Sequence, residues 1–226
     1  MKVPFITFEG TEGSGKTTQI SLLAERLRSK GHTVRTLREP GGTPIGEEIR
    51  HTLKHSPANH AMTPEAELLL MNASRAQLVR EVIRPALEAG EIVLCDRFYD
   101  STTAYQGYGR QLDLQVVKHI IDVAVGETHP DLTLLFLVPQ EVSEARRLAR
   151  QPTLPLPFQR DRMEEADQSF FARVARGYHA IAAAEPQRVR QIDATGDVAS
   201  IQAAIWTLVQ PLVKKLTVMQ QQHHAP

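Results

Sequence analysis

The residues with the clearest chemical meaning stand in one run near the N-terminus, Gly10-Thr-Glu-Gly-Ser-Gly-Lys16-Thr17-Thr18. The run matches the P-loop pattern G-x-x-x-x-G-K-[ST], in which glycines let successive backbone N–H groups turn inward around a polyphosphate. Lys16 then reaches the β- and γ-phosphates, and the Thr17 hydroxyl becomes a ligand of Mg²⁺. A nucleoside triphosphate site is therefore predicted, and its residues are Gly10, Thr11, Glu12, Gly13, Ser14, Gly15, Lys16, Thr17 and Thr18.

An acid and an arginine farther along the chain suit the same chemistry. The apolar run 91–95 predicts a buried strand, and Asp96 and Arg97 follow it directly. P-loop proteins hold an Mg²⁺-binding Asp at the end of such a strand, and an Arg beside it can clamp phosphates. An isolated Asp-Arg pair would be a commonplace ion pair, but this position makes Asp96 the second predicted metal ligand.

Alternating strand and helix patterns predict how these residues are positioned. Strands are expected over 3–8, 33–37, 91–95, 131–138 and 189–193. Helices are expected after the P-loop, over 64–89 with a kink or break at Pro85, near 114–124, over 141–150, near 171–181 and over 201–216. This alternation predicts an α/β fold with a five-stranded parallel sheet and helices on both faces. The Gly- and Pro-rich segment 38–47 is expected to be an irregular functional loop.

Length and composition limit the class of protein. With 226 residues, the chain suits a single domain over 1–216, with a lid over about 146–164 and a disordered tail over 217–226. Lys+Arg equals Asp+Glu at 26 each, so no basic field indicates nucleic acid or a membrane surface as a partner. The single cysteine, Cys95, and the lack of a signal peptide or a membrane-length apolar run favour a cytoplasmic protein.

Three classes of P-loop protein were weighed against these features. A GTPase should carry the guanine-reading sequence Asn-Lys-x-Asp, which does not occur in the chain. A nucleotide-driven motor or a nucleotide-gated interaction protein would usually need further domains. A small-molecule phosphotransferase needs a donor site, an acceptor pocket and a lid that excludes water, and the sequence offers candidates for all three.

Several motifs in order along the chain carry a family resemblance. They are 8–18 around the P-loop, Arg38-Glu-Pro-Gly-Gly-Thr43 with Gly46-Glu47, Ser74-Arg75-Ala-Gln77, Asp96-Arg97-Phe98 through Gly107, and Ile192-Asp-Ala-Thr-Gly196. Together they resemble bacterial thymidylate kinases, which carry no arginine in the P-loop, and the resemblance covers roughly 3–216. The block from Asp96 to Gln106 is the specific signature of that family.

The resemblance implies transfer of the γ-phosphoryl group of ATP to dTMP with Mg²⁺, in a homodimer. It implies that Glu12 holds the acceptor's 3′-hydroxyl, and that Arg97, with Arg38, holds the acceptor phosphate. The base would contact Met71, Arg75 and Thr102, and Tyr105 would crowd the sugar's 2′ position. The resemblance also assigns Ser101 and Gln106 to the same acceptor site. Because the P-loop has no arginine, the catalytic cation is expected from the lid, with Arg150 and Arg160 as candidates beside Lys16, Arg97 and Glu12.

The chain departs from the family pattern at three places. Met71 stands where the family usually has Phe, Leu137 replaces an Asp common late in the fourth strand, and the lid is short of arginine and rich in proline. Two alternatives therefore stay open at this point. One is a kinase for a modified or other pyrimidine deoxynucleoside monophosphate, and the other is a catalytically weak nucleotide-binding homologue.

Overall fold

The computed structural model describes residues 3–139, 141–143, 145–146 and 167–223. Five parallel strands form one sheet in the order β2-β3-β1-β4-β5. Their bounds are β1 (Phe5–Gly10), β2 (Val34–Arg38), β3 (Ile92–Asp96), β4 (Leu132–Leu137) and β5 (Val189–Asp193). All five strands lie within two residues or so of their predicted positions, and the predicted fold class is confirmed.

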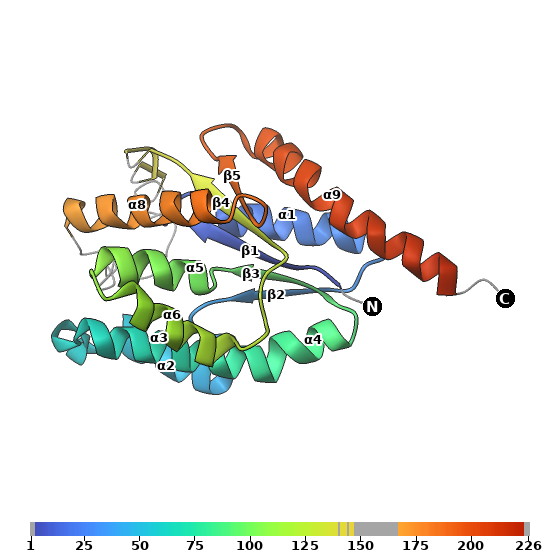
Figure 1. The fold of residues 1–226 in the computed structure, drawn as a ribbon. Helices are drawn as coiled ribbons and strands as arrows, with labels where there is room; N and C mark the ends of the chain where they lie inside the picture. Colours follow the sequence, from blue (N-terminus) through green and yellow to red (C-terminus); the bar gives the residue numbers. More distant parts are fainter. Residues whose placement is uncertain (1–2, 140, 144, 147–166, 224–226) are drawn as a thin grey trace.

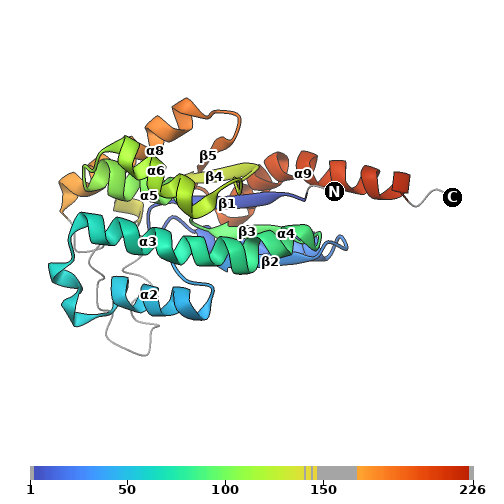
Figure 2. The same ribbon diagram turned by 60° about the horizontal axis from the view of Figure 1, so that its bottom comes forward.

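Helices cover both faces of the sheet (Figure 1). One face carries α1 (Lys16–Arg28) and α9 (Val198–His223), and the other carries the remaining helices. These are α3 (Pro64–Leu78), α4 (Arg84–Glu88), α5 (Tyr99–Thr102), α6 (Leu114–Val125) and α8 (Gln168–Ala184). In the turned view, α2 (Pro44–Lys54) lies outside α3, as a further layer (Figure 2).

The two faces of β1 explain why this strand sits at the centre. Ile6 and Phe8 point to α1 and α9, whereas Phe5 packs with the helices on the opposite face. Successive side chains of a strand alternate between faces, so Thr7 and Glu9 share the face of Phe5. Both are fully buried. The strand that leads into the P-loop therefore buries a carboxylate just before the loop begins.

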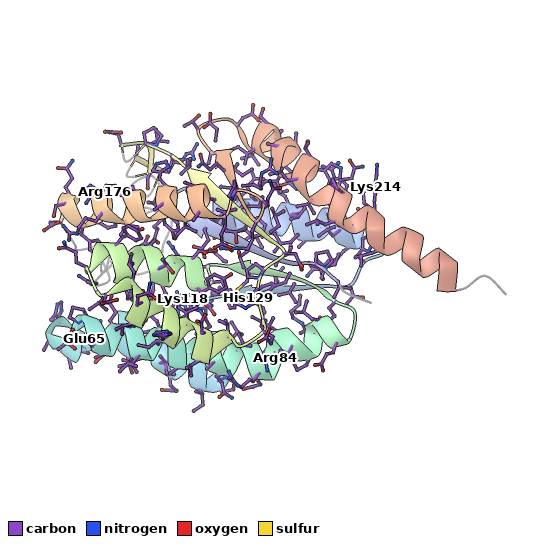
Figure 3. All side chains as sticks on the ribbon, in the orientation of Figure 1. Glu65, Arg84, Lys118, His129, Arg176 and Lys214 are labelled. Atoms are coloured by element: carbon purple, nitrogen blue, oxygen red, sulfur yellow. The ribbon has the colours of Figure 1, made fainter. Side chains whose placement is uncertain are left out.

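Charged residues on the helices lie in two environments. Arg84, at the start of α4, donates hydrogen bonds to Val125 O at 3.0 Å and Thr128 Oγ1 at 2.8 Å, and so ties α4 to the end of α6 (Figure 3). Glu65, Arg176 and Lys214 are instead exposed on α3, α8 and α9. Within the described part of the chain, no helix has the length and apolar character that a membrane span requires.

Four expectations about local structure need correction. The segment 38–47 is not irregular throughout, because α2 begins at Pro44 with the Thr43 hydroxyl capping it. The predicted helix 64–89 is α3 and α4 joined by a π-helical segment, η2 (Val79–Ile83), just before Pro85. A second π-helical segment, η3 (Thr103–Gly109), continues α5 and was not anticipated. The last helix extends to His223, so the predicted disordered tail from Thr217 is wrong over that stretch.

The centre of the sheet is closed to solvent. Cys95, on β3 between β1 and β2, has 0% exposed surface, and burial raises the pKa of its thiol well above the ordinary value. A thiol in this position is a core residue and not an accessible nucleophile.

Candidate active site

The P-loop turns sharply between β1 and α1, and two of its glycines are required by close contacts. Gly10 has a φ of 129°, and a side chain there would place its Cβ 2.5 Å from Phe136 O. Gly13 has a φ of 79°, and its Cβ would lie 2.5 Å from Ser143 O. Both conformations are open to glycine and strained for other residues. The loop is thus packed between the start of α1 and the chain that follows β4.

Lys16 lies at the first position of α1 with its side chain folded inside the loop. Its Nζ donates to Gly10 O at 3.1 Å, to Thr11 O at 2.8 Å and to Ser14 Oγ at 3.3 Å. Burial, followed by the positive charge of Arg97, lowers the pKa of the Lys16 ammonium from 10.5 to about 7. Two buried cations, one from the P-loop and one from the end of β3, are stabilised by an anion, so this position suits the phosphates of a nucleotide.

The two predicted metal ligands meet at the mouth of the loop. Thr17 Oγ1 donates to Asp96 Oδ2 at 3.2 Å, although the residues are far apart in sequence. Among the described residues, the buried Asp96 Oδ1 has no hydrogen-bond partner. A hydroxyl beside a carboxylate with an unused oxygen is the oxygen donor set that Mg²⁺ prefers, with phosphates and water completing the shell. The residues therefore fit Mg²⁺.

Arg97 follows Asp96 in a left-handed backbone conformation, with a φ of 70°. Its Nη1 donates to Ser101 Oγ at 3.1 Å and to Tyr178 Oη at 3.4 Å. The guanidinium carbon lies 5.2 Å from the ring centroid of Tyr105, close enough for a cation–π contact. The structure thus brings together Arg97, Ser101 and Tyr105, three residues predicted for the acceptor site.

Glu9, which the sequence reasoning did not select, lies at the centre of this group. Its Oε1 accepts from Phe98 N at 2.7 Å and from Ser101 N at 3.3 Å. Its Oε2 accepts from Ser101 Oγ at 2.5 Å and from Tyr178 Oη at 3.0 Å. Burial, and then the charge of Asp100, raise the pKa of Glu9 to about 7, whereas the charge of Arg97 opposes the shift. A buried carboxylate is thus held just behind the predicted acceptor-phosphate arginine.

Arg75 is fully buried on α3, and its guanidinium already donates hydrogen bonds to other side chains of the protein. Its Nη2 and Nε donate to Glu39 Oε2 at 2.6 and 2.9 Å, and its Nη1 donates to Asn72 Oδ1 and Thr102 Oγ1, both at 2.9 Å. Burial raises the pKa of Glu39 although Arg75 opposes the shift. Arg75 and Thr102, both predicted to read the base, are therefore in direct contact, and Met71 lies half-buried one helical turn before Arg75.

Two other predicted acceptor residues have partners within the protein. Gln106 donates from Nε2 to Glu67 Oε1 at 2.8 Å, and the same carboxylate pairs with Arg110 at 3.1 Å. Arg38 pairs with Glu47 at 3.0 Å, and both side chains are nearly half exposed. No contact brings Arg38 to Arg97 within the described residues, so its predicted share in the acceptor phosphate site stays a prediction.

A cavity of about 540 Å³ opens beside the P-loop at the carboxyl ends of the strands. Its lining includes Gly10 and Thr11 from the loop, Val138 after β4, Tyr178 on α8, and Thr195 after β5. Ligands of open α/β sheets bind at this edge. This end of the sheet therefore holds the cavity, the cations Lys16 and Arg97, and the two predicted metal ligands.

Comparison with known proteins decides the family. The model of the family described as "Thymidylate kinase" matches residues 8–205, which is most of the chain. The chain belongs to the thymidylate kinase family. Both the predicted family and the predicted nucleoside monophosphate kinase fold are confirmed.

Individual thymidylate kinases match over nearly their whole length. The chain is 48% identical to "Thymidylate kinase" of Thermomicrobium roseum over 211 residues, covering 93% of this chain and 96% of the relative. It is 50% identical to the thymidylate kinase of Citrifermentans bemidjiense over 194 residues, covering 86% and 85%. A crystal structure of thymidylate kinase from Ehrlichia chaffeensis superposes with a TM-score of 0.72 at 32% identity, covering 93% and 99%.

The predicted lid lies largely outside the described residues. Arg150 and Arg160, the two candidates for a catalytic cation, both fall there. Arg146, at the start of that segment, donates to Ala194 O at 2.8 Å and thus contacts the loop after β5. The Glu12 side chain is exposed, and its backbone carbonyl accepts a hydrogen bond from Ser143 Oγ.

Three residues of the site were missed, and each had a weak signal. Glu9 is an acid inside an otherwise uncharged apolar strand, and such an acid needs buried partners. Tyr178 lies on the apolar face of α8 and so looks like an ordinary core residue, yet a buried tyrosine hydroxyl needs a partner. Glu39 lay within a segment interpreted as a loop. For all three, the partner comes from a distant part of the sequence.

Proposed function

We propose that this chain transfers the γ-phosphoryl group of ATP to dTMP, giving ADP and dTDP, with Mg²⁺ held at Thr17 and Asp96. The observation that carries the proposal is the convergence of Lys16, Asp96 and Arg97 at one end of the sheet. The P-loop end supplies a donor site, and Arg97 supplies an acceptor site close enough for its charge to lower the pKa of Lys16. Membership of the thymidylate kinase family agrees with this reaction.

The protein's part in the reaction is to position and to neutralise charge. Backbone N–H groups of the P-loop and the Lys16 ammonium bind the β- and γ-phosphates, while Arg97 binds the phosphate of the acceptor. Mg²⁺, when bound, neutralises charge that develops on the transferred phosphoryl group. The attacking phosphate oxygen is already ionised at pH 7, so no general base is needed. Alignment of the two nucleotides supplies most of the rate.

Arg75 and Thr102 favour a pyrimidine with a carbonyl at position 4. Four of the five guanidinium N–H groups of Arg75 donate to described residues, and one on Nη2 has no acceptor among them. That donor matches the O4 acceptor of thymine or uracil and opposes the amino donor of cytosine. A thioether such as Met71 packs well against the flat face of a base. Tyr105, stacked on Arg97, is placed to limit space near the sugar.

A homodimer is part of the proposal, and it is supported by an exposed apolar face on α6. Val116 and Val123 lie two helical turns apart with 50% and 77% exposed surface, and Leu69 on the adjoining α3 is 56% exposed. Apolar side chains gathered on one side of a monomer mark a contact surface. Sedimentation analysis should give a mass near twice the chain's 25.2 kDa. A monomer at micromolar concentration would contradict the homodimer. The cytoplasmic location stays a prediction.

The activity is tested with one assay across several acceptors. ADP release is coupled to a spectrophotometric reaction, with ATP and Mg²⁺ held constant and dTMP, dUMP, dCMP and dGMP supplied in turn. We expect dTMP to be the best acceptor, dUMP to be weaker, and dCMP and dGMP to be rejected. Turnover of another monophosphate with dTMP inert would contradict the thymidylate assignment and leave the kinase assignment standing.

A further inference from the structure

Glu9 makes contacts that binding of ATP or of the base does not explain. Its carboxylate is completely buried, and it accepts hydrogen bonds from Phe98 N, Ser101 N, Ser101 Oγ and Tyr178 Oη. Three of these donors belong to the five residues that begin with Arg97. The fourth, Tyr178, is itself a contact of Arg97. The carboxylate therefore holds in place the groups that lie around Arg97. It does not itself pair with the guanidinium.

The backbone at Arg97 needs such support. A φ of 70° is an uncommon conformation for a residue with a side chain, and it persists only where the surroundings fix it. Arg97 N donates to Phe8 O at 2.9 Å, which holds the residue on its N-terminal side. On the C-terminal side, the next N–H, that of Phe98, donates to Glu9 at 2.7 Å. Adjacent residues of β1 thus hold both sides of Arg97.

The direction of the hydrogen bonds also favours a carboxylate at this position. The hydroxyls of Ser101 and Tyr178 donate to Glu9, which leaves their lone pairs free to accept from Arg97 Nη1. An amide at position 9 would place N–H groups against the same lone pairs. Those groups would then compete with the guanidinium for its two acceptors.

A purely structural role for Glu9 is less well supported, because α5 is anchored independently. Asp100 accepts from Arg188 Nη1 and Nη2 at 2.7 and 2.8 Å, and Thr133 Oγ1 donates to the same carboxylate at 3.1 Å. This buried ion pair ties α5 to the chain that precedes β5. The helix would therefore keep its place without Glu9, whereas Phe98 N, Ser101 Oγ and Tyr178 Oη would lose the acceptor that they share.

We propose that Glu9 is a positioning residue for the acceptor: it fixes the Arg97 backbone and orients the guanidinium through the hydroxyls of Ser101 and Tyr178. The inference rests on the proposed role of Arg97 as the ligand of the acceptor phosphate. Glu9 does not touch either nucleotide. Its effect should therefore appear in the use of dTMP and be absent from the use of ATP.

The test measures KM for dTMP, KM for ATP and kcat separately in Glu9→Gln and Tyr178→Phe. We expect Glu9→Gln to raise KM for dTMP about tenfold, the scale of one misdirected hydrogen bond to a charged group, with KM for ATP unchanged. Tyr178→Phe removes one of the two hydroxyls and should raise KM for dTMP by a smaller factor. An unchanged KM for dTMP in Glu9→Gln, or an equal rise in both KM values, overturns the proposal.

Thr7→Val is the matched control, because Thr7 lies on the same strand and the same face and is equally buried. Its Oγ1 bonds to Thr133 Oγ1 at 2.7 Å, away from Arg97. Thr7→Val should lower the melting temperature while KM for dTMP stays unchanged. A rise in KM for dTMP equal to that of Glu9→Gln would show a general effect of disturbing β1 and would overturn the proposal.

The variant Arg97→Lys shows whether a negative result refutes only the role of Glu9 or also the proposed role of Arg97. If Arg97→Lys leaves KM for dTMP unchanged, the role of Arg97 is wrong, and the proposal for Glu9 is overturned with it. If Arg97→Lys raises KM for dTMP and Glu9→Gln does not, only the proposal for Glu9 is overturned. When both single variants raise it, the double variant should show less than the product of the two factors, because the two changes act on one contact.

Discussion

The P-loop and the surroundings of Arg75 hold buried cations in opposite ways. Lys16 donates to two carbonyls and one hydroxyl of its own loop, and the charge of Arg97 lowers its pKa. Arg75 is instead paired with the buried carboxylate of Glu39 at 2.6 Å. The charge at the P-loop remains available to phosphates. The charge at Arg75 is already balanced, so in the proposed function Arg75 would select the base by the direction of its remaining N–H group and not by its charge.

The largest effect is expected from removing the P-loop cation. Lys16→Ala should lower kcat by about a hundredfold to a thousandfold, because a fixed charge at the transferred phosphoryl group is lost. The fold should persist, since burial already disfavours the charged form of Lys16. Coupled ADP release gives kcat, and circular dichroism confirms the fold. Lys30→Ala, just after α1, is the control and should keep full activity. Undiminished turnover in a folded Lys16→Ala protein would contradict the donor-site assignment.

Arg75→Ala should differ from Lys16→Ala because it also damages stability. The change leaves Glu39 buried without its partner, which should lower the free energy of unfolding by about 3–5 kcal/mol. It should also raise KM for dTMP more than about tenfold, since a charge-assisted hydrogen bond to the base is lost. Chemical denaturation measures the first effect and steady-state kinetics the second.

Arg35→Ala provides the comparison for that stability effect. Arg35 pairs with Glu91 at 2.8 Å, but its side chain is 50% exposed. An exposed pair contributes only about 0–1 kcal/mol, and Arg35 lies away from the ligand edge at the other end of β2. Equal losses of stability in Arg35→Ala and Arg75→Ala would show that the Glu39–Arg75 pair does not behave as a buried ion pair.

A smaller effect on the free energy of unfolding is expected from a change of pH, because Glu9 titrates. Its pKa is raised in the folded protein from 4.5 to about 7, so the unfolded chain releases this proton first as pH rises. Between about pH 4.5 and 7 the unfolded state therefore binds fewer protons, and the free energy of unfolding should fall with pH by at most about 1.4 kcal/mol per unit. Asp100 and Arg97 face the carboxyl group and act on it in opposite directions.

Denaturation curves at several pH values for the wild type and Glu9→Gln check this slope. Glu9→Gln has no titratable group at position 9. Subtracting its curve from that of the wild type therefore removes the contributions that the two proteins share. The stability of the wild type relative to Glu9→Gln should decline as the pH rises from about 4.5 to 7, where only the folded wild type still holds the Glu9 proton. Thr7→Val should run parallel to the wild type. Parallel curves for Glu9→Gln and the wild type would contradict the raised pKa.

Sequence reasoning could select the residues of the proposed donor site as one set, because they are close together in sequence. The P-loop residues are contiguous, and Asp96 follows a strand whose apolar run is easy to recognise. For the proposed acceptor site, sequence reasoning selected individual residues but not the contacts between them. The Arg75–Glu39 and Glu9–Tyr178 contacts join residues 36 and 169 positions apart, and no periodic pattern encodes such pairs.

The prediction of local structure was wrong at the start of α2, because residues that break helices precede it. A Thr-Pro pair begins both α3, at Thr63-Pro64, and α2, at Thr43-Pro44, but the second pair lies in the segment that was predicted to be an irregular loop. The glycines that precede Thr43 favoured irregular structure, but the threonine hydroxyl and the proline begin α2 all the same. The two π-helical segments have no comparable sequence signal.

The sealed position of Cys95 gives the protein a built-in reporter. The Cys95 thiol is covered by side chains of α3 and α6, so a labelling reagent can reach it only when these helices separate from the sheet. The rate of thiol modification in the native protein therefore measures how often this helical layer opens, and no cysteine needs to be introduced. For the same reason, a cysteine introduced on an exposed helix would react alone, so a dye can be attached at one chosen point while Cys95 stays in place.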